Sequence, residues 1–330
     1  MSPADYHYAS AAQTDFTDIP KISVSESLAK GGLSMLGERL VSAAQSAGFF
    51  YLTDHDIDDG LRAAAFDASR RFFELDATLK NSIAVNHHQR GWMAQGITRL
   101  EGSDAADAKE VFFWGYEPSA DYLDRGLPLV APNQWPDEVA PFLKEQILPY
   151  YTEVKQLGSL VLSALAVGLG KEADFFTSHY ENGLARGQLV CYPPSQAEDA
   201  EVRRFGAAAH TDFGVLTLLS QDNLGGLQVQ NRAGDWIEAP PLEGSLICNI
   251  GDLLERWTNG KLVSTRHRVI NRTDKTRYSI PIFHDPSSDA VISADEFSSD
   301  DNPALFEPVE AGHYIVSRNQ KNFLHYKSET

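Results

Sequence analysis

The sequence predicts a mainly β protein with flanking α-helices, in which a jelly-roll core packs against helices from the first half of the chain. Helical spacing of apolar residues dominates to about residue 170. From about Gly187 the pattern changes to short β-rich runs separated by turn residues, such as "GQLVCYPP", "GGLQVQNRAGDWIEAPP" and "GSLICNIGD". Short strands at this spacing are typical of a sandwich or barrel.

Three helices are expected before this change. The first has apolar residues at helical spacing from Leu33 to Ala44 and ends before Gly48, ahead of an aromatic strand "FFYL". The second covers the apolar positions of "LRAAAFDASRRFFEL", from Leu61 to Phe73. The third runs from about Pro136 to Gly168 or Gly170, with Pro149 predicted to kink it.

Composition limits the classes of partner. The chain has 330 residues, 42% of them hydrophobic and 22% charged, which is ordinary for one globular unit. Its formal net charge of −18 repels a phosphate backbone or an anionic membrane, so we expect neither nucleic acid nor a membrane as partner. The oligomeric state has no signature in the sequence.

The expected location is the cytoplasm. The first ten residues, "MSPADYHYAS", lack the charged and apolar halves of a signal peptide, and no apolar window is long enough to span a membrane. The chain has 2 cysteines, Cys191 and Cys248, both in apolar strand-like runs. We expect buried free thiols rather than a disulfide framework.

The run "AAAHTDFGVLTLL" contains a candidate pair of metal ligands, His210 and Asp212. Side chains two apart on a β-strand project to the same side, so both can reach one ion. The other His-x-acid triplet, His179 to Glu181, reads as helix, where residues two apart diverge by about 200°. A His-x-Asp pair alone is also compatible with a structural buried histidine, so the interpretation needs a third ligand.

The segment "LVSTRHRVINRTDKTRYSIPIF" supplies one in His267. A turn near Arg272 would pair His267 with a strand carrying Arg277 and Ser279 on one face. Two imidazoles and a carboxylate are the ligand set of non-haem Fe(II) oxygenases, whereas structural zinc sites usually close four ligands.

Arg277 and Ser279 would form a receptor for a carboxylate. The alternative for Arg277, a surface salt bridge, is the weaker interpretation beside this ligand set. His284 has the opposite strand parity to Arg277, which predicts a histidine at the surface or behind the ligands.

At this point the chain resembles the isopenicillin N synthase-like, or plant-type, Fe(II)/2-oxoglutarate-dependent dioxygenases. The resemblance covers nearly the whole chain, from "AGFFYLTDH", "RGW" and "KEVFFWGYE" to "YPP", "HTDFGVLTLL", "NIGDLLERWTNGKLVSTRHRV" and "RYSIPIF". It implies a double-stranded β-helix within one compact unit. That unit comprises an N-terminal dioxygenase segment at 1–120, a long helix region at 121–185, the jelly-roll core at 186–290 and a C-terminal tail at 291–330.

The resemblance also implies roles for single residues. His210, Asp212 and His267 would bind Fe(II), and Arg277, Ser279 and Tyr192 would hold the distal carboxylate of 2-oxoglutarate. Tyr192 is equally compatible with plain packing beside a proline turn. Many plant members have an asparagine two residues before this tyrosine, where this chain has Val190. With O2, such an enzyme oxidises a small molecule and releases succinate and CO2; we expect hydroxylation, with desaturation or cyclisation as alternatives.

Candidate walls of the substrate pocket are residues that neighbour the ligand strands or lie in the segment that covers the barrel mouth in relatives. They are Phe112, Trp114, Phe213, Phe283 and Arg99. The aromatic residues among them are also compatible with an ordinary core, and Arg99 with an exposed loop.

Two alternatives to this function stay open at the level of sequence. An isopenicillin N synthase-type or ACC oxidase-type enzyme has the same iron ligands but does not use 2-oxoglutarate. A non-catalytic jelly-roll binding protein is the remoter one. The primary substrate is not encoded in these motifs, because one fold hosts many substrates.

Overall fold

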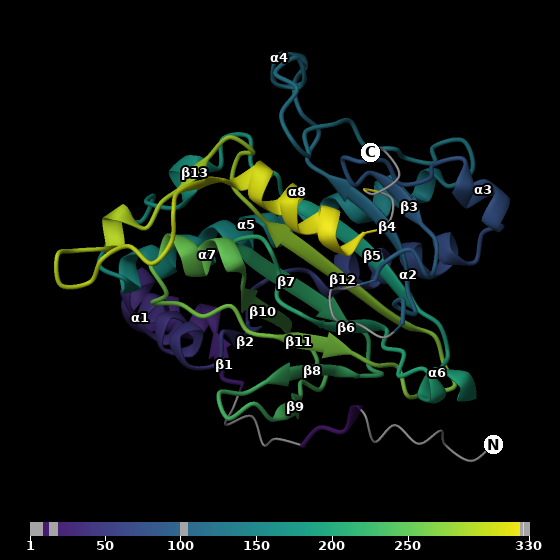
Figure 1. Cartoon of the computed structure of the whole chain (residues 1–330), viewed down its shortest axis with the longest axis horizontal. Helices are drawn as coiled ribbons and strands as arrows, with labels where there is room; N and C mark the ends of the chain where they lie inside the picture. Colours follow the sequence, from purple (N-terminus) through teal and green to yellow (C-terminus); the bar gives the residue numbers. More distant parts are fainter. Residues whose placement is uncertain (1–8, 13–18, 100–104, 324–325, 327–330) are drawn as a thin grey trace.

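The computed structural model consists of a layer of helices, a large mixed sheet and a smaller antiparallel sheet (Figure 1). It describes residues 9–12, 19–99, 105–323 and 326. The long helices from the first half of the chain lie on one face of the large sheet, and the small sheet faces the other. In the described part of the chain, no helix is both long and apolar enough to cross a membrane.

The large sheet has eight strands in the order β1-β2-β10-β7-β12-β5-β4-β3. All its pairings are antiparallel except that of β1 with β2. In chain order its strands are β1 (Lys21–Ser23), β2 (Phe49–Thr53), β3 (Gly91–Met93), β4 (Glu110–Gly115), β5 (Arg186–Tyr192), β7 (Leu216–Gln221), β10 (Leu246–Ile250) and β12 (Arg277–His284). Strands from the N-terminal segment and from the jelly-roll core therefore share one sheet.

The small sheet has four strands in the order β6-β11-β8-β9. They are β6 (Ala207–His210), β8 (Leu227–Gln230), β9 (Trp236–Glu238) and β11 (His267–Val269). A two-stranded sheet is formed by β13 (Val291–Ile292) and β14 (Val309–Glu310).

The helices are mostly in the first half of the chain, as predicted. They are α1 (Val24–Ser46), α2 (Asp59–Phe73), α3 (Ala77–Asn81), α4 (Ala120–Leu123), α5 (Pro141–Gly168), α6 (Ala197–Glu201), α7 (Asp252–Trp257) and α8 (Ala311–Asn322). Helix α1 is interrupted at Gly31 and Gly32, where Gly32 has a φ of 62°, so the stretch predicted from Leu33 is its second half. Helix α5 includes Pro149 and begins at Pro141 rather than Pro136.

Helices α1 and α5 pack closely because glycine lies at their contact. A Cβ on Gly37 would lie 2.2 Å from the carbonyl oxygen of Ala164. Together with α2, these helices cover one face of the large sheet and bury the larger hydrophobic cluster. Burial of this kind is the main favourable contribution to folding.

Strand alternation divides the residues of β4 and β5 between two cores. Phe112, Trp114 and Leu189 belong to the cluster under the helices. Phe113 and Val190 belong to the second cluster, between the two sheets. The space between the sheets therefore receives every second residue of these strands.

The predicted pairing of the His267 strand with the Arg277 strand is wrong. Strand β11 pairs with β6 and β8 in the small sheet, whereas β12 pairs with β5 and β7 in the large one. With both edges of β11 occupied, β12 has no edge left to join. Asn271 stabilises the connection between the sheets, donating to the carbonyl oxygens of Tyr192, Pro193 and Lys275.

Candidate active site

Three potential metal ligands meet between the two sheets. His210 ends β6, Asp212 follows it two residues later, and His267 begins β11 directly opposite His210. Asp212 Oδ1 lies 3.9 Å from His210 Nε2 and 3.6 Å from His267 Nε2. One ligand atom from each residue falls within 4.8 Å of the others, which is close enough to share one ion.

Hydrogen bonds to neighbouring groups orient these ligands. The Nδ1 atoms of His210 and His267 lie 2.6 Å and 3.2 Å from the carbonyl oxygens of Ala208 and Thr265. An Nδ1–H donated to a carbonyl leaves Nε2 with a free lone pair. Both imidazoles therefore present a metal-binding nitrogen toward Asp212.

Asp212 is oriented by two buried polar side chains. Its Oδ2 accepts hydrogen bonds from Thr217 Oγ1 at 2.6 Å and from Asn249 Nδ2 at 2.7 Å. Oδ1 is thereby left for the metal. Neither supporting residue was predicted from the sequence, although each is a polar residue facing inward from a largely apolar strand, β7 or β10.

The protonation states fit metal binding. Burial, followed by the nearby His267, lowers the pKa of His210 to about 3, so its ring is neutral at neutral pH. Burial raises the pKa of Asp212, but the two imidazoles and the bonds from Thr217 and Asn249 outweigh this, and its pKa is lowered overall. Neutral imidazole and carboxylate are the forms that coordinate metal.

A cavity of about 70 Å³ extends from these ligands between the sheets to Arg277. The Arg277 side chain is buried, with an exposed fraction of 1%. Its Nε donates to the carbonyl oxygen of Gly225 and its Nη2 donates to Gln221 Oε1 at 3.2 Å. Its Nη1 has no hydrogen-bond partner in the described part of the chain. A buried cationic donor without a partner is costly and fits an anionic ligand.

The other predicted carboxylate-binding residues lie beside Arg277. Ser279 is two residues along β12 and lines the same cavity. Tyr192 is the cross-strand partner of Arg277, whose guanidinium carbon lies 4.8 Å from the centre of its ring. Val190 also lines this cavity, opposite Ser279, so its apolar side chain replaces the amide of many plant relatives at a position that faces the ligand.

The residues present thus fit both groups that the resemblance implies. The ligand set has the composition and open side of a two-histidine, one-carboxylate iron centre. The unpartnered Nη1 of Arg277 lies at the far end of the same cavity, where it can receive the second carboxylate of a dicarboxylate. We call this space the inner cavity.

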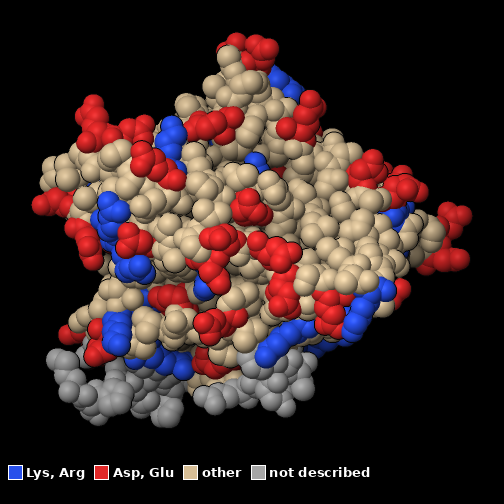
Figure 2. Space-filling view, turned by 180° about the vertical axis from the view of Figure 1, so that it is seen from behind, with Lys and Arg blue, Asp and Glu red and all other residues tan. Residues whose placement is uncertain are grey.

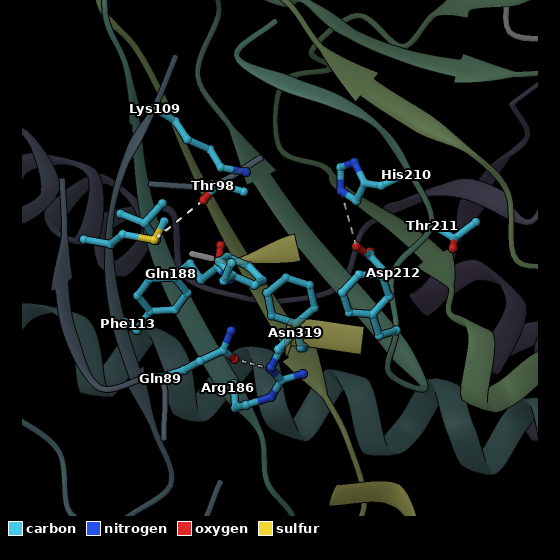
Figure 3. A pocket seen from close by; sticks show the side chains of 15 residues that line it. Gln89, Thr98, Lys109, Phe113, Arg186, Gln188, His210, Thr211, Asp212 and Asn319 are labelled. Carbon is cyan, nitrogen blue, oxygen red and sulfur yellow. Dashed lines mark hydrogen bonds and ion pairs between the residues drawn. The ribbon is translucent and has the colours of Figure 1, made fainter. Parts of the chain in front are cut away.

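A second cavity, of about 80 Å³, shares His210 and Asp212 with the inner cavity; we call it the outer cavity (Figure 3). Both cavities are lined by His210, Asp212, Lys109, Gln188 and Phe283. Two of the predicted pocket residues, Phe213 and Phe283, line the outer cavity. A molecule in this cavity would therefore lie next to the metal.

The other predicted pocket residues are elsewhere. Phe112 and Trp114 face the helices, so their prediction as pocket walls is wrong. Successive residues of β4 point to opposite faces, and Val111 and Phe113 line the cavity instead. Arg99 is exposed and is not part of the cavity lining, although Thr98 before it is.

His284 needs a further correction. It points away from Arg277 as predicted, but it is buried against α5 rather than lying at the surface or behind the ligands. Gly158 of α5 leaves room for its ring, since a Cβ there would lie 2.9 Å from the imidazole.

Six polar residues of the outer cavity come from distant parts of the sequence and were not predicted from it. They are Gln89, Thr98, Lys109, Arg186, Gln188 and Asn319. Asn319 belongs to α8, in the C-terminal tail. No motif signals these positions, because only the fold brings the segments together.

Two regions of the chain match known families. Residues 179–286 match the 2OG-Fe(II) oxygenase superfamily, and residues 19–138 match the non-haem dioxygenase in morphine synthesis N-terminal family. The two matches contain all three candidate metal ligands, Arg277, Ser279 and the N-terminal wall of the outer cavity.

Individual relatives extend these matches over most of the chain. A 2-oxoglutarate-Fe(II) type oxidoreductase of Emericella nidulans is 36% identical, over 78% of this chain and 75% of the relative. A homoarginine-6-hydroxylase of Oryza sativa subsp. japonica is 31% identical, over 94% of this chain and 99% of the relative.

A solved structure shares the fold. The crystal structure of full-length Neurospora crassa T7H in complex with alpha-KG and thymine superposes with a TM-score of 0.79 at 31% identity. The superposition covers 91% of this chain and 96% of that one. The double-stranded β-helix expected from the sequence is therefore confirmed, as are Fe(II) and 2-oxoglutarate as the groups on which the family depends. The chain belongs to the 2OG-Fe(II) oxygenase superfamily.

Proposed function

We propose that this enzyme hydroxylates a small molecule, with Fe(II) bound by His210, Asp212 and His267 and 2-oxoglutarate held at its far carboxylate by Arg277 and Ser279. One observation carries the proposal: a complete set of metal ligands and a buried guanidinium whose Nη1 has no partner among the described residues lie at the two ends of one cavity. Tyr192 would complete the carboxylate site beside Arg277.

When bound, iron supplies the oxidising chemistry, coupled to the conversion of 2-oxoglutarate and O2 to succinate and CO2. The protein's own groups supply binding and orientation. Thr217 and Asn249 fix the carboxylate of Asp212, and two backbone carbonyls fix the imidazoles. Arg277 sets the direction in which the cosubstrate enters, because its fork accepts a carboxylate in a defined plane.

The substrate would occupy the outer cavity, which touches His210 and Asp212. The relatives offer two compounds to test first, thymine and homoarginine, since T7H was solved with the former and the rice relative is a hydroxylase of the latter. The inner cavity favours 2-oxoglutarate use over an isopenicillin N synthase-type or ACC oxidase-type reaction, because it provides a separate site for a second carboxylate away from the metal.

We also propose that the protein acts in the cytoplasm and does not bind nucleic acid. Two buried thiols, Cys191 and Cys248, are compatible with a reducing compartment. Figure 2 shows acidic side chains spread over the face opposite to that of Figure 1, with basic side chains in small groups among them. A nucleic-acid interface usually requires a continuous basic surface.

The decisive experiment measures succinate formed from labelled 2-oxoglutarate by the purified protein with Fe(II) and O2, with and without added substrate. We expect slow turnover without substrate and faster turnover with a true one. His210→Ala should lose both, together with iron binding measured by metal analysis. If the parent protein neither forms succinate nor binds 2-oxoglutarate in its metal form, the proposed function is wrong.

A further inference from the structure

The outer cavity contains a polar group that the protein itself does not satisfy. Asn319 projects from α8 into this cavity, and its exposed fraction is only 2%. Its Nδ2 is buried and has no hydrogen-bond partner among the described residues. A buried donor without a partner is unfavourable, so a ligand that offers an acceptor at this wall of the cavity would be stabilised by Asn319.

The neighbouring contacts hold α8 in place, so Asn319 is presented in a fixed position. Tyr314 donates to Asp252 Oδ2 at 3.3 Å, on the segment that follows β10. The guanidinium carbon of Arg318 lies 5.1 Å from the centre of the Phe213 ring. At the end of the helix, the backbone N–H of Arg99 donates to the carbonyl oxygen of Asn322 at 3.1 Å.

Lys109 provides a second donor to the same space. Its Nζ lies 3.1 Å from Asp107 Oδ2, and the Asp107 side chain is 1% exposed and outside the cavity lining. The other carboxylate oxygen of Asp107 accepts the backbone N–H of Ala208, so the aspartate is fixed to β6 behind the lysine. An ammonium has three protons, and one ion pair leaves protons that can point into the cavity.

Arg186, like Lys109, is a cation of the cavity lining that is paired with a buried aspartate. It lines the outer cavity, while its Nη2 donates to Asp285 Oδ2 and its Nη1 to Gln89 Oε1, both at 2.8 Å. Asp285, like Asp107, is not part of the lining. The carboxylates that neutralise both cations are thus outside the cavity lining, whereas the two cations are part of it. In Figure 3, Lys109, Gln188 and Asn319 surround the space next to His210 and Asp212.

The volume of the cavity limits the size of its ligand. One water molecule needs roughly 10–15 Å³ of such volume, so 80 Å³ suits a compact molecule of about one substituted ring. Phenylalanines 113, 213 and 283 provide apolar walls for the rest of it.

We propose that the substrate is a compact molecule that presents carbonyl-type oxygens, of an amide, imide or carboxylate, to Asn319 and Lys109. This inference rests on the proposed function, because it assigns the substrate to the outer cavity. Asn319 and Lys109 then select against molecules of the same size that carry only donors.

Three ring compounds that differ in one substituent test the proposal: benzamide, benzoate and benzylamine. Each is titrated anaerobically into the Fe(II) enzyme saturated with 2-oxoglutarate, so that the inner cavity is filled, and binding is measured by calorimetry. We expect at least one of the two carbonyl compounds to bind about tenfold or more tightly than benzylamine. Preference for benzamide would indicate that the substrate presents a neutral carbonyl group, and preference for benzoate would indicate a carboxylate.

Variants assign this preference to residues. Asn319→Asp keeps the shape of the side chain but exchanges a donor for an anionic acceptor, so it should weaken benzoate binding and strengthen benzylamine binding. Lys109→Met should reduce benzoate binding more than benzamide binding. Gln320→Ala, at the neighbouring exposed position of α8, should bind all three compounds like the parent.

The proposal is overturned if benzylamine binds as tightly as the carbonyl compounds, if neither carbonyl compound binds at millimolar concentration, or if Asn319→Asp keeps the parental preference. Succinate formation from 2-oxoglutarate, measured on the same parent sample, tests the proposed function separately. Normal succinate formation with the wrong ring preference would reject this inference alone.

Discussion

The inner and outer cavities meet at His210 and Asp212 but are built in different ways. The wall of the inner cavity consists mostly of strand residues, which include Ser279 and Tyr192 beside Arg277 and Asn249 beside Asp212. The outer cavity also draws on the segments around Gln89 and Thr98 and on helix α8. A shared reaction can therefore depend on paired strands, while the substrate is selected by segments that can change without disturbing that pairing.

The largest effect is expected at the far end of the inner cavity. Arg277→Met should weaken 2-oxoglutarate binding by roughly 150-fold to 5,000-fold, since losing one partner of a buried charged pair costs about 3–5 kcal/mol. Iron binding should persist, because the metal ligands are untouched. Titration of the Fe(II) protein with 2-oxoglutarate measures this.

The matched control for that prediction is Arg272→Met, in the exposed connection between β11 and β12. It should bind 2-oxoglutarate like the parent. An Arg277→Met protein with parental affinity would show that the cosubstrate carboxylate binds elsewhere.

The second prediction separates the two faces of β4. Phe112→Ala should lower the free energy of unfolding by about 3 kcal/mol or more, because it opens a cavity under the helices. Phe113→Ala should cost less stability, because its ring already borders the outer cavity, and should mainly change substrate-stimulated turnover. Urea unfolding and succinate assays on both proteins measure the difference; a reversed order of stability losses would contradict the assignment of faces.

The third prediction concerns the support of Asp212. Asn249→Leu removes one of two hydrogen bonds to Oδ2 and should weaken Fe(II) binding by about 10- to 100-fold. Thr217→Ser keeps the hydroxyl and serves as the control. Metal titration, with circular dichroism to verify folding, reports the effect, and unchanged iron affinity in Asn249→Leu would mean that Thr217 alone orients the carboxylate.

Much of the inner cavity could be predicted from the sequence because its signals are local. Arg277 and Ser279 are two residues apart in β12, where strand alternation places both on one face, and Asp212 follows His210 by two residues, just past the end of β6. The predicted pairing of the His267 strand with the Arg277 strand was wrong because strand pairing is not a local property. Which strands become neighbours in a jelly roll depends on long-range sheet closure, not on the turn between consecutive strands.

The outer cavity could be predicted only in part. Phe213 and Phe283 were found because each is next to a ligand or a strand that carries one. Phe112 and Trp114 were wrong because every residue of "VFFW" is apolar, so periodicity gives no parity. Asn319 and Arg186 could not be predicted, because they are 133 residues apart in the sequence and only the fold brings them to one cavity.

The smallest effect is expected on the back of β12, at His284. Burial lowers the pKa of its imidazole to about 3, with a smaller contribution from Lys155. The ring of Tyr180 packs against it at a tilt, with the ring centres 4.8 Å apart, and Ser159 Oγ lies 3.2 Å from Nε2. An unfolded histidine has a pKa near 6.5, so the unfolded state binds more protons between about pH 3 and 6.5. The contribution of His284 to the free energy of unfolding is therefore complete above about pH 6.5 and decreases as the pH falls below this value.

At pH 5 the loss amounts to about 2 kcal/mol, from roughly 1.5 pH units at 1.36 kcal/mol each. His284→Gln removes this titration, so the stability difference between parent and variant should shift by up to about this amount between pH 7 and pH 5 in urea unfolding. A difference independent of pH would show that folding does not lower the pKa of His284. Iron and 2-oxoglutarate binding should match the parent at neutral pH, because His284 lies on the face of β12 opposite Arg277, and a change in either would mean that the two faces of this strand are not independent.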